Sequence, residues 1–177
     1  MVFTELPLPG AFLIEPQRHA DERGFFARVC CQREFSAHGL KSDFVQSSVS
    51  YSKRRGTLRG LHYQAPPHAE TKLVRCTQGV AFDVLVDLRP GSPTFKRWHA
   101  CELTAENRRA VYIPEGMAHG FQTLVDDTEL LYAISPFYEP AAGQGLRWND
   151  PTLAVSWPIM PPIVISPIDQ QLPLLAV

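Results

Sequence analysis

Two histidines, a lysine and an arginine are the side chains in this sequence best suited to chemistry. His62 and Arg59 lie in the segment 59–64, Lys72 follows shortly after, and His119 lies much later in the segment 114–121. Imidazole can bind a metal ion or transfer a proton near neutral pH, and a nearby cation can stabilise negative charge. Because glycine or proline turn signals flank both histidines, the strands of a barrel would bring them to one interior.

The spacing of the histidines fits a metal site only in part. Metal-binding barrels of the cupin class commonly carry H-x-H in an early motif and another histidine in a later P-x-G-x-x-H segment. Pro114, Gly116 and His119 fit the later segment, but Gln64 replaces the second histidine of the early motif. An amide oxygen is a weak substitute for imidazole, and a catalytic metal usually needs three good protein ligands. We therefore expect no metal, with a metal-dependent cupin enzyme as an alternative.

Period-two patterning predicts that strands position these residues. The segment 80–88 places its apolar side chains on one face and acidic residues among those of the other face. Similar short runs lie between turn signals at residues 71–77, 95–103, 109–113 and 129–134. Many short strands without crossover helices are typical of an antiparallel sandwich or barrel. We predict an all-β fold that forms a single domain over residues 1–177.

Helix signals are few and short. Residues 34–39 can form one turn that ends at Gly39, and residues 104–107 are short enough for a capped turn. Because proline fixes φ and removes a backbone donor, a proline-rich segment favours an extended chain. The end of the sequence is rich in proline, at Pro158, Pro161, Pro162, Pro167 and Pro173. We therefore expect the C-terminal segment to lie over the domain in extended form.

The composition argues against several classes of partner. Seventeen Lys and Arg against eighteen Asp and Glu give a net charge of -1, so no global field indicates nucleic acid or an anionic membrane. No apolar stretch approaches the length of a transmembrane helix. The cysteines lack C-x-x-C spacing; they are Cys30, Cys31, Cys76 and Cys101. We expect a cytoplasmic protein with reduced thiols that binds neither nucleic acid nor membrane.

A longer series of spaced motifs carries a specific resemblance. The motifs run in order through essentially the whole chain: Asp21-x-Arg23-Gly24-x-Phe26, Gln46-x-Ser48, Leu58-Arg59-Gly60-Leu61-His62-Tyr63-Gln64, Lys72-Leu73-Val74-Arg75, Asp83-Val84-x-Val86-Asp87-Leu88-Arg89, Pro114-x-Gly116-x-Ala118-His119-Gly120-Phe121, Tyr132, Trp148-Asn149-Asp150-Pro151, Trp157-Pro158 and Ser166-x-x-Asp169. In this series the chain resembles the dTDP-4-dehydrorhamnose 3,5-epimerases. The resemblance implies a jelly-roll barrel of the cupin class that works without metal or cofactor and forms a homodimer.

The resemblance also implies the reaction. The family inverts C3 and C5 of dTDP-4-dehydro-6-deoxy-D-glucose, which gives dTDP-4-dehydro-L-rhamnose on the route to dTDP-L-rhamnose. A proton leaves the carbon beside the C4 ketone, charge moves onto the C4 oxygen, and a proton returns from the opposite face. By similarity, His62 is the base and Asp169 orients its ring. Lys72 would stabilise the enolate, and Tyr132 would be the acid on the far face.

A second set of residues is assigned by similarity to substrate binding. Arg23 and Arg59 would meet the diphosphate, because a guanidinium fork matches phosphate oxygens. His119 would help hold the sugar or phosphate, and Tyr138 would stack on the base. The remaining binding positions of this set are Gln46, Ser48 and Lys72.

The positions of Arg59 and His62 predict a local irregularity. In a regular strand, side chains three positions apart face opposite sides. A cavity shared by Arg59 and His62 therefore requires a bend or bulge, and Gly60 lies between them.

Four binding positions depart from the family pattern. The family expects glutamate, asparagine, glutamate and lysine at positions that here hold Arg28, Ser48, Gly143 and Ile168. A site that loses or reverses polar partners can change its selectivity by orders of magnitude. One alternative is therefore a 3-only or 5-only epimerase acting on another nucleotide-linked 4-keto sugar. Another is a non-catalytic nucleotide-sugar binding module that keeps the cavity.

Overall fold

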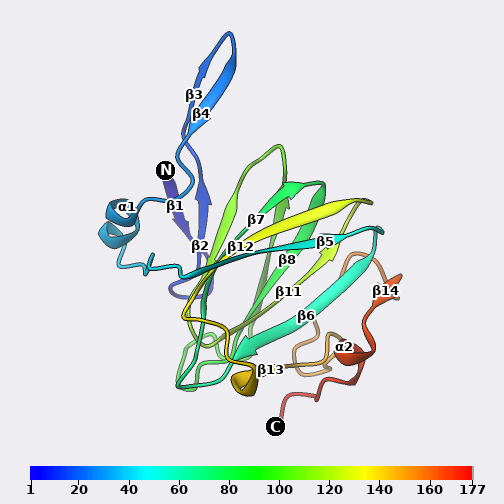
Figure 1. The fold of residues 1–177 in the computed structure, drawn as a ribbon. Helices are drawn as coiled ribbons and strands as arrows, with labels where there is room; N and C mark the ends of the chain where they lie inside the picture. Colours follow the sequence, from blue (N-terminus) through cyan, green and yellow to red (C-terminus); the bar gives the residue numbers. More distant parts are fainter. Residues whose placement is uncertain (177) are drawn as a thin grey trace.

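The computed structural model describes residues 1–176, and strands make up most of its regular structure (Figure 1). The strands are β1 (Val2–Glu5), β2 (Phe12–Glu15), β3 (Arg18–Asp21), β4 (Gly24–Ala27), β5 (Gln46–Ser52), β6 (Thr57–Gln64), β7 (Thr71–Gln78), β8 (Val80–Asp87), β9 (Trp98–Thr104), β10 (Ala110–Ile113), β11 (Met117–Thr123), β12 (Thr128–Ser135), β13 (Gly143–Gly145) and β14 (Val164–Ile165). The helices are α1 (Gln32–Ala37), the 3-10 helix η1 (Pro140–Ala142) and α2 (Pro167–Gln171). Within residues 1–176, no helix has the length and apolar character needed to cross a membrane.

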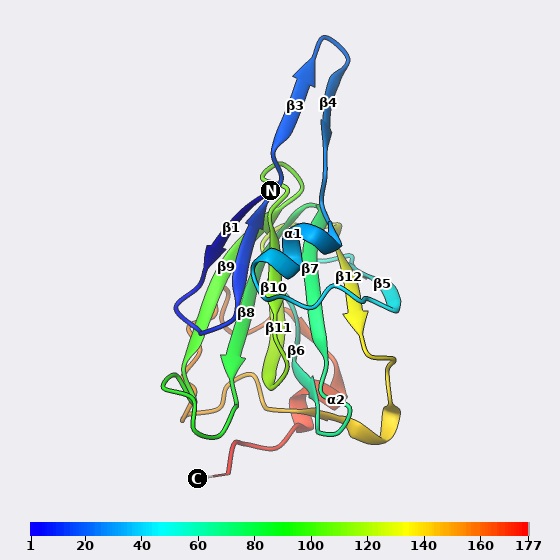
Figure 2. The same cartoon turned by 90° about the vertical axis from the view of Figure 1, so that its left-hand side faces the viewer.

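Two mainly antiparallel sheets pack against each other. The first has the strand order β1-β2-β10-β7-β12-β5, and the second has the order β13-β6-β11-β8-β9. The short strand β14 adds to β6 in parallel. Strands β3 and β4 form a separate hairpin that projects from the body of the molecule in both views (Figures 1 and 2). This arrangement is an antiparallel jelly roll, and the predicted all-β fold class is confirmed.

Apolar side chains are buried in three places. The cluster between the two sheets includes Val74, Leu85, Val111, Phe121 and Leu130. On the other face of the second sheet, the C-terminal segment forms a cover and contributes residues such as Leu153 and Trp157. Helix α1 buries Phe35 completely in a third cluster, against residues of the first sheet. Both sheets are therefore covered on each face over much of their area, which explains the many apolar residues in the strands.

The strand predicted at residues 80–88 is confirmed as β8, but its acidic face lies inside the barrel. Val84 and Val86 belong to the cluster under the C-terminal cover, while Leu85 belongs to the cluster between the sheets. Asp83 and Asp87 are fully buried on the same face as Leu85. Because both faces of this strand are covered, its acidic side chains are not exposed to solvent. Each buried carboxylate therefore needs hydrogen-bond or ion-pair partners inside the protein.

The short turns and the C-terminal segment largely agree with the predictions from the sequence. The predicted turn at residues 34–39 is the end of α1, and the segment 104–107 is a capped turn in which Asn107 N donates to Thr104 Oγ1 at 2.8 Å. The C-terminal segment runs extended across the second sheet, as expected, but it also contains α2, which the sequence analysis did not predict (Figure 1). Proline at the first helical position and Ser166 as the N-cap are the signals that favour this short helix.

Candidate active site

A cavity of about 940 Å³ opens between the two sheets and reaches α2. Strands β6, β11 and β13 of the second sheet form one wall, and β5, β7 and β12 of the first sheet form the other. The predicted site residues that line it are Ser48, Arg59, His62, Lys72, His119, Tyr132, Tyr138 and Asp169, together with the departures Gly143 and Ile168. Residues far apart in the sequence are thus brought into one space.

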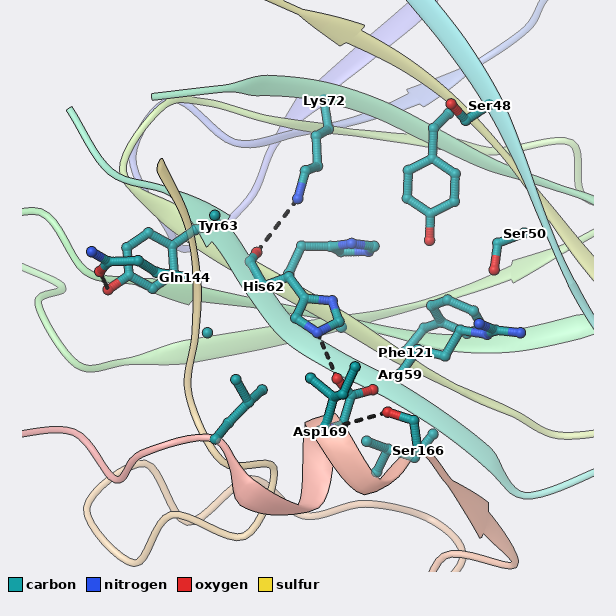
Figure 3. Close-up of a pocket in the computed structure, with 18 of the residues that line it drawn as sticks. Ser48, Ser50, Arg59, His62, Tyr63, Lys72, Phe121, Gln144, Ser166 and Asp169 are labelled. Carbon is teal, nitrogen blue, oxygen red and sulfur yellow. Dashed lines mark hydrogen bonds and ion pairs between the residues drawn. The ribbon is translucent and has the colours of Figure 1, made fainter. Parts of the chain in front are cut away.

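His62 and Asp169 form a hydrogen-bonded pair at the boundary between β6 and α2 (Figure 3). His62 Nε2 lies 2.7 Å from Asp169 Oδ1, and the backbone N of Gly60 donates to Asp169 Oδ2 at 3.3 Å. Burial alone would raise the pKa of Asp169, but the hydrogen bonds from His62 and Gly60 outweigh burial and lower this pKa below its usual value. The carboxylate therefore stays charged beside the imidazole.

The position of Asp169 is fixed by the start of α2. The side chain of Ser166 accepts a hydrogen bond from Asp169 N at 3.0 Å, which is an N-cap contact. This contact orients the first turn of α2, and Asp169 itself is only 5% exposed. Figure 3 shows the carboxylate pointing from α2 toward the imidazole. The cap thus sets the direction of the carboxylate that holds His62.

A bulge in β6 places Arg59 and His62 on the same side. His119 of β11 pairs with His62 and Phe121 pairs with Arg59, so two residues of β6 lie opposite one residue of β11. Gly60 has φ of +107°, and a Cβ there would lie 2.7 Å from the Gly120 Cα. Only glycine fits this backbone conformation and this close approach. The irregularity predicted at Gly60 is confirmed.

Lys72 extends from β7 into the cavity toward the backbone of β6 (Figure 3). Its Nζ donates to the His62 carbonyl oxygen at 3.4 Å and forms an ion pair with Glu70 Oε1 at 2.8 Å. Glu70 also lines the cavity and was missed by the sequence analysis. Its signal was available, because side chains two positions apart in an extended chain share a face.

Tyr132 lines the cavity from β12 in the first sheet, on the wall opposite His62. Its ring lies edge to face with the ring of His119, with centroids 5.8 Å apart. Burial raises the pKa of Tyr132 well above its usual value, and the charge of Asp83 adds to this increase, while Arg59 opposes it. The phenol is therefore held in its protonated form.

His119 forms a second histidine–carboxylate pair, with Asp83 of β8. His119 Nε2 lies 2.8 Å from Asp83 Oδ2, and both side chains are buried. The other oxygen, Asp83 Oδ1, has no hydrogen-bond partner within the described residues. Asp83 was also missed. Its signal was the acidic residue on an interior face of β8, diagonal to His119 across the β8–β11 pair.

The mouth of the cavity is mainly aromatic and apolar. Tyr138 and Ile168 are exposed there, and a Cβ at Gly143 would lie 3.3 Å from the Tyr138 hydroxyl oxygen. Gln46 does not line the cavity. Its side-chain oxygen accepts a hydrogen bond from Tyr138 N, which anchors the segment that carries the ring. Ser48 lines the wall next to this segment.

Arg23 and Arg28 lie outside the cavity of their own chain. Arg23 is at the turn of the β3–β4 hairpin, pairs with Asp21, and leaves 84% of its side chain exposed. Arg28 follows the hairpin and pairs with Glu34 of α1 at 3.1 Å. The structure of one chain therefore does not bring these two arginines to the other predicted binding residues.

Comparisons with known proteins agree along the whole chain. The profile of the dTDP-4-dehydrorhamnose 3,5-epimerase family matches residues 5–177. A protein of that name from Pseudomonas aeruginosa is 46% identical over 172 residues, which is 97% of this chain and 94% of the relative. The chain belongs to this family. A crystal structure of a family member from Bacillus anthracis, with TDP and PPi bound, has a TM-score of 0.94 at 43% identity and covers 98% of this chain and 99% of that one.

Membership of the epimerase family confirms the predicted isomerase class. The family's neighbours in structure are not uniform in reaction. A 3'-monoepimerase from Streptomyces bikiniensis, in complex with dTDP-quinovose, has a TM-score of 0.88 at 36% identity and covers 96% of this chain and 85% of that one. Fold and general chemistry are thus common to these proteins, while the number of inverted carbons differs among them.

In this member of the epimerase family, the two cavity histidines are poorly arranged for a shared metal. The Nε2 atoms of His62 and His119 each face their own carboxylate. Gln64, at the position of a possible third ligand, donates to the His68 carbonyl oxygen at 3.0 Å and accepts from Glu139 N at 2.7 Å. Within residues 1–176, no group of three His, Cys, Asp or Glu side chains is placed to hold a metal ion. The donor set does not fit the metal-dependent alternative.

Proposed function

We propose that the chain epimerises dTDP-4-dehydro-6-deoxy-D-glucose at C3 and C5 to give dTDP-4-dehydro-L-rhamnose, in deoxysugar biosynthesis. The proposal is supported by one arrangement above all. A histidine–carboxylate pair on one wall of the cavity faces a protonated tyrosine from the opposite wall, with an ammonium group between the sheets. Inversion of a carbon centre needs a base and an acid on opposite faces of the sugar, and the two sheets supply these separately.

His62 is the proposed base. With Nε2 bonded to Asp169, the Nδ1 atom is left to accept the proton from carbon. The imidazole side chain is 48% exposed, so a substrate in the cavity can reach it. As the ring gains its proton it becomes a cation, and the charged Asp169 stabilises that cation. The pair thus lowers the barrier to removing a weakly acidic proton.

Lys72 and Tyr132 complete the proposed proton transfer. The charge that develops on the C4 oxygen would be stabilised by Lys72, and one preorganised donor contributes on the order of 3 kcal/mol to such a step. Tyr132 would then return a proton from the far face, because its raised pKa keeps it protonated until a strong base such as an enolate carbon is present. His119, beside Tyr132, would hold the sugar or the adjoining phosphate.

The nucleotide would lie toward the mouth of the cavity. Arg59 points into the cavity beside His62 and is the proposed partner of the diphosphate, and Tyr138 offers an exposed ring face to the base. Ser48 would line the path of the nucleotide, and Gln46 would act by anchoring Tyr138.

We further propose a homodimer in which the β3–β4 hairpin of one protomer reaches the cavity of its partner. The hairpin projects from the body of the chain (Figure 2), and its residue Phe26 is 74% exposed. Contiguous exposed apolar patches mark surfaces that another protein covers, and Phe25 beside Phe26 is also 41% exposed. Docked in this way, Arg23 would contact the diphosphate of a substrate bound in the cavity of the partner protomer. A stable monomer in concentration-dependent sizing would contradict this assembly.

Residues 1–177 are proposed to act as one domain in the cytoplasm. One apolar cluster joins the two sheets, which supports a single folding unit. All four cysteines are unpaired, which supports a reducing compartment.

The test is incubation with dTDP-4-dehydro-6-deoxy-D-glucose in deuterated water, with deuterium at C3 and C5 measured separately by NMR. We expect exchange at both carbons. Exchange at C3 alone or C5 alone would favour the alternative of a 3-only or 5-only epimerase. This alternative is supported by the departures Ser48, Gly143 and Ile168 and by the similarity to a 3'-monoepimerase. No exchange, with dTDP still bound, would favour the non-catalytic binding module and overturn the proposal.

A further inference from the structure

Glu70 lies in the cavity because it continues the inward face of β7. Val74 and Cys76 of this strand belong to the cluster between the sheets, and Lys72 is two positions before Val74. Glu70 is a further two positions before Lys72, so the extended chain directs both side chains to the same interior. The carboxylate and the ammonium meet there at 2.8 Å.

The ion pair between Glu70 and Lys72 differs from the other lysine and arginine pairs of residues 1–176. Its side chains are 8% and 9% exposed, whereas those of Glu15 and Arg109 are 39% and 41% exposed at the same distance of 2.8 Å. Removing two charges from water costs free energy that their attraction often fails to recover, so stability is a weak reason for such a pair. Its position in the wall of the substrate cavity indicates a functional reason.

The contacts of Lys72 define what Glu70 can do. An ammonium group has three N–H donors, and Lys72 directs one to Glu70 and one to the His62 carbonyl oxygen. At least one donor is left for a ligand. We infer that Glu70 is a positioning residue, which fixes the Lys72 ammonium beside His62 and directs it toward the C4 oxygen of the substrate. This inference rests on the proposed function, in which Lys72 stabilises the enolate.

A double-mutant cycle tests this role. Glu70→Gln keeps the shape of the side chain and removes its charge, and we expect kcat to fall about tenfold while KM and the Kd of dTDP change less than about threefold. In a Lys72→Ala background, Glu70→Gln should cause no further loss, because Glu70 acts only through Lys72. Residual turnover can be followed by solvent deuterium uptake over hours. Full kcat in Glu70→Gln, or losses that multiply in the double variant, would overturn the inference.

Glu15→Gln is the matched control. It removes one carboxylate from an ion pair of equal length outside the cavity, at β2. We expect its kcat to stay within about twofold of the wild-type value, since exposed pairs contribute little. Glu70→Asp, which retains the charge, should recover part of the lost kcat. A Glu70→Asp variant no better than Glu70→Gln would show that charge on this side chain is not what matters.

A second measurement does not depend on turnover. Acetic anhydride labels a lysine side chain more readily when it is released from an ion pair, so the labelling rate of Lys72 at pH 8, measured by mass spectrometry, reports how firmly Glu70 holds this side chain in place. Labelling should be several-fold faster in Glu70→Gln than in the wild type or in Glu15→Gln. Equal rates would contradict the inference even if the enzyme is active. Faster labelling in a protein that shows no exchange at C3 or C5 would instead overturn the proposed function alone.

Discussion

The two histidine–carboxylate pairs of the cavity share the same atoms and nearly the same distance, 2.7 Å for His62–Asp169 and 2.8 Å for His119–Asp83. They differ in access. The imidazole of His62 is 48% exposed, whereas His119 is 4% exposed and its carboxylate is fully buried. They also differ in origin, because Asp169 comes from α2 and Asp83 comes from a strand next to that of His119. The distance between imidazole and carboxylate therefore does not reveal the role of a pair, whereas the exposure of the pair and the elements around it do.

The open pair suits proton transfer with a substrate, and the closed pair suits a fixed part of the wall. A base must present a free nitrogen to the reacting carbon, and only His62 has such room. In the closed pair the charge of Asp83 acts at a distance, as one of the causes of the raised pKa of Tyr132.

The largest difference is expected between the two histidines. His62→Ala should lower kcat by about 10³-fold or more and abolish exchange at both C3 and C5, because the base is lost. His119→Gln can still donate to Asp83, and it should mainly raise KM. Steady-state kinetics with NMR detection of exchange would compare them. Full activity of His62→Ala would reject its assignment as the base.

The carboxylates should differ in the same direction. Asp169→Asn should lower kcat by about 10²-fold, since the imidazolium loses its charged partner. Asp83→Asn should lower kcat less and instead lower the free energy of unfolding by about 1 to 3 kcal/mol, because a buried hydrogen-bonded charge is removed. Kinetics and denaturant unfolding of both variants are the measurements. Equal effects on kcat would erase the distinction between the pairs.

Tyr132→Phe should separate the two half-reactions. Proton removal by His62 remains possible, but return of a proton from the opposite face is impaired, so net epimerisation should fall by about 10²-fold. Exchange of substrate hydrogen for solvent deuterium without inversion should fall less. Parallel loss of exchange and inversion would contradict the role of Tyr132 as the acid. Tyr63→Phe, which changes a tyrosine bonded to Gln144 at the mouth, is the matched control.

A smaller effect concerns stability and pH. The pKa of Asp169 is lower in the folded protein, so its charged form stabilises the fold above the usual carboxyl pKa of about 3.9. This contribution is lost as pH falls through the lowered pKa. The difference in Tm between wild type and Asp169→Asn should therefore be positive at pH 7 and shrink progressively as the pH falls below the usual carboxyl pKa and through the lowered pKa of Asp169. A difference independent of pH would contradict this linkage.

The smallest effect is expected from chelation. Because each cavity histidine is bonded to its own carboxylate, treatment with EDTA should leave kcat within about twofold of the untreated value. Stoichiometric iron, manganese or zinc in the purified protein, with activity lost on chelation and restored by that metal, would favour the metal-dependent alternative and a different arrangement of both pairs.

Much of the fold could be predicted because alternation in short runs reports the strands directly. The segment 80–88 showed this pattern, and the bulge followed from requiring Arg59 and His62 to share one cavity with Gly60 between them. The partner of His62 could not be deduced from spacing alone. Asp169 lies 107 residues away on a helix of five residues, and its assignment came from resemblance.

Other parts of the site were missed for physical reasons. Glu70 and Asp83 carry charges that a sequence pattern assigns by default to solvent, yet each is buried by contacts made between strands distant in sequence. Arg23 does not reach the cavity of its own chain, because it lies at the turn of the β3–β4 hairpin, which projects from the body of the molecule. A local sequence pattern cannot predict contacts between residues that are distant in the sequence.

The extra residue in β6 changes the phase of that strand. Leu58 and Leu61 both pack under the C-terminal cover, and Arg59 and His62 both face the cavity. Residues that face the same side of β6 are therefore three positions apart here, where a regular strand would place them two positions apart. Loss of the single residue at Gly60 would restore the ordinary period of two, leave Arg59 and His62 on one face and bring them closer together along the strand. The separation between the proposed phosphate contact and the proposed base is therefore set by one residue of main chain, without any change in side-chain chemistry.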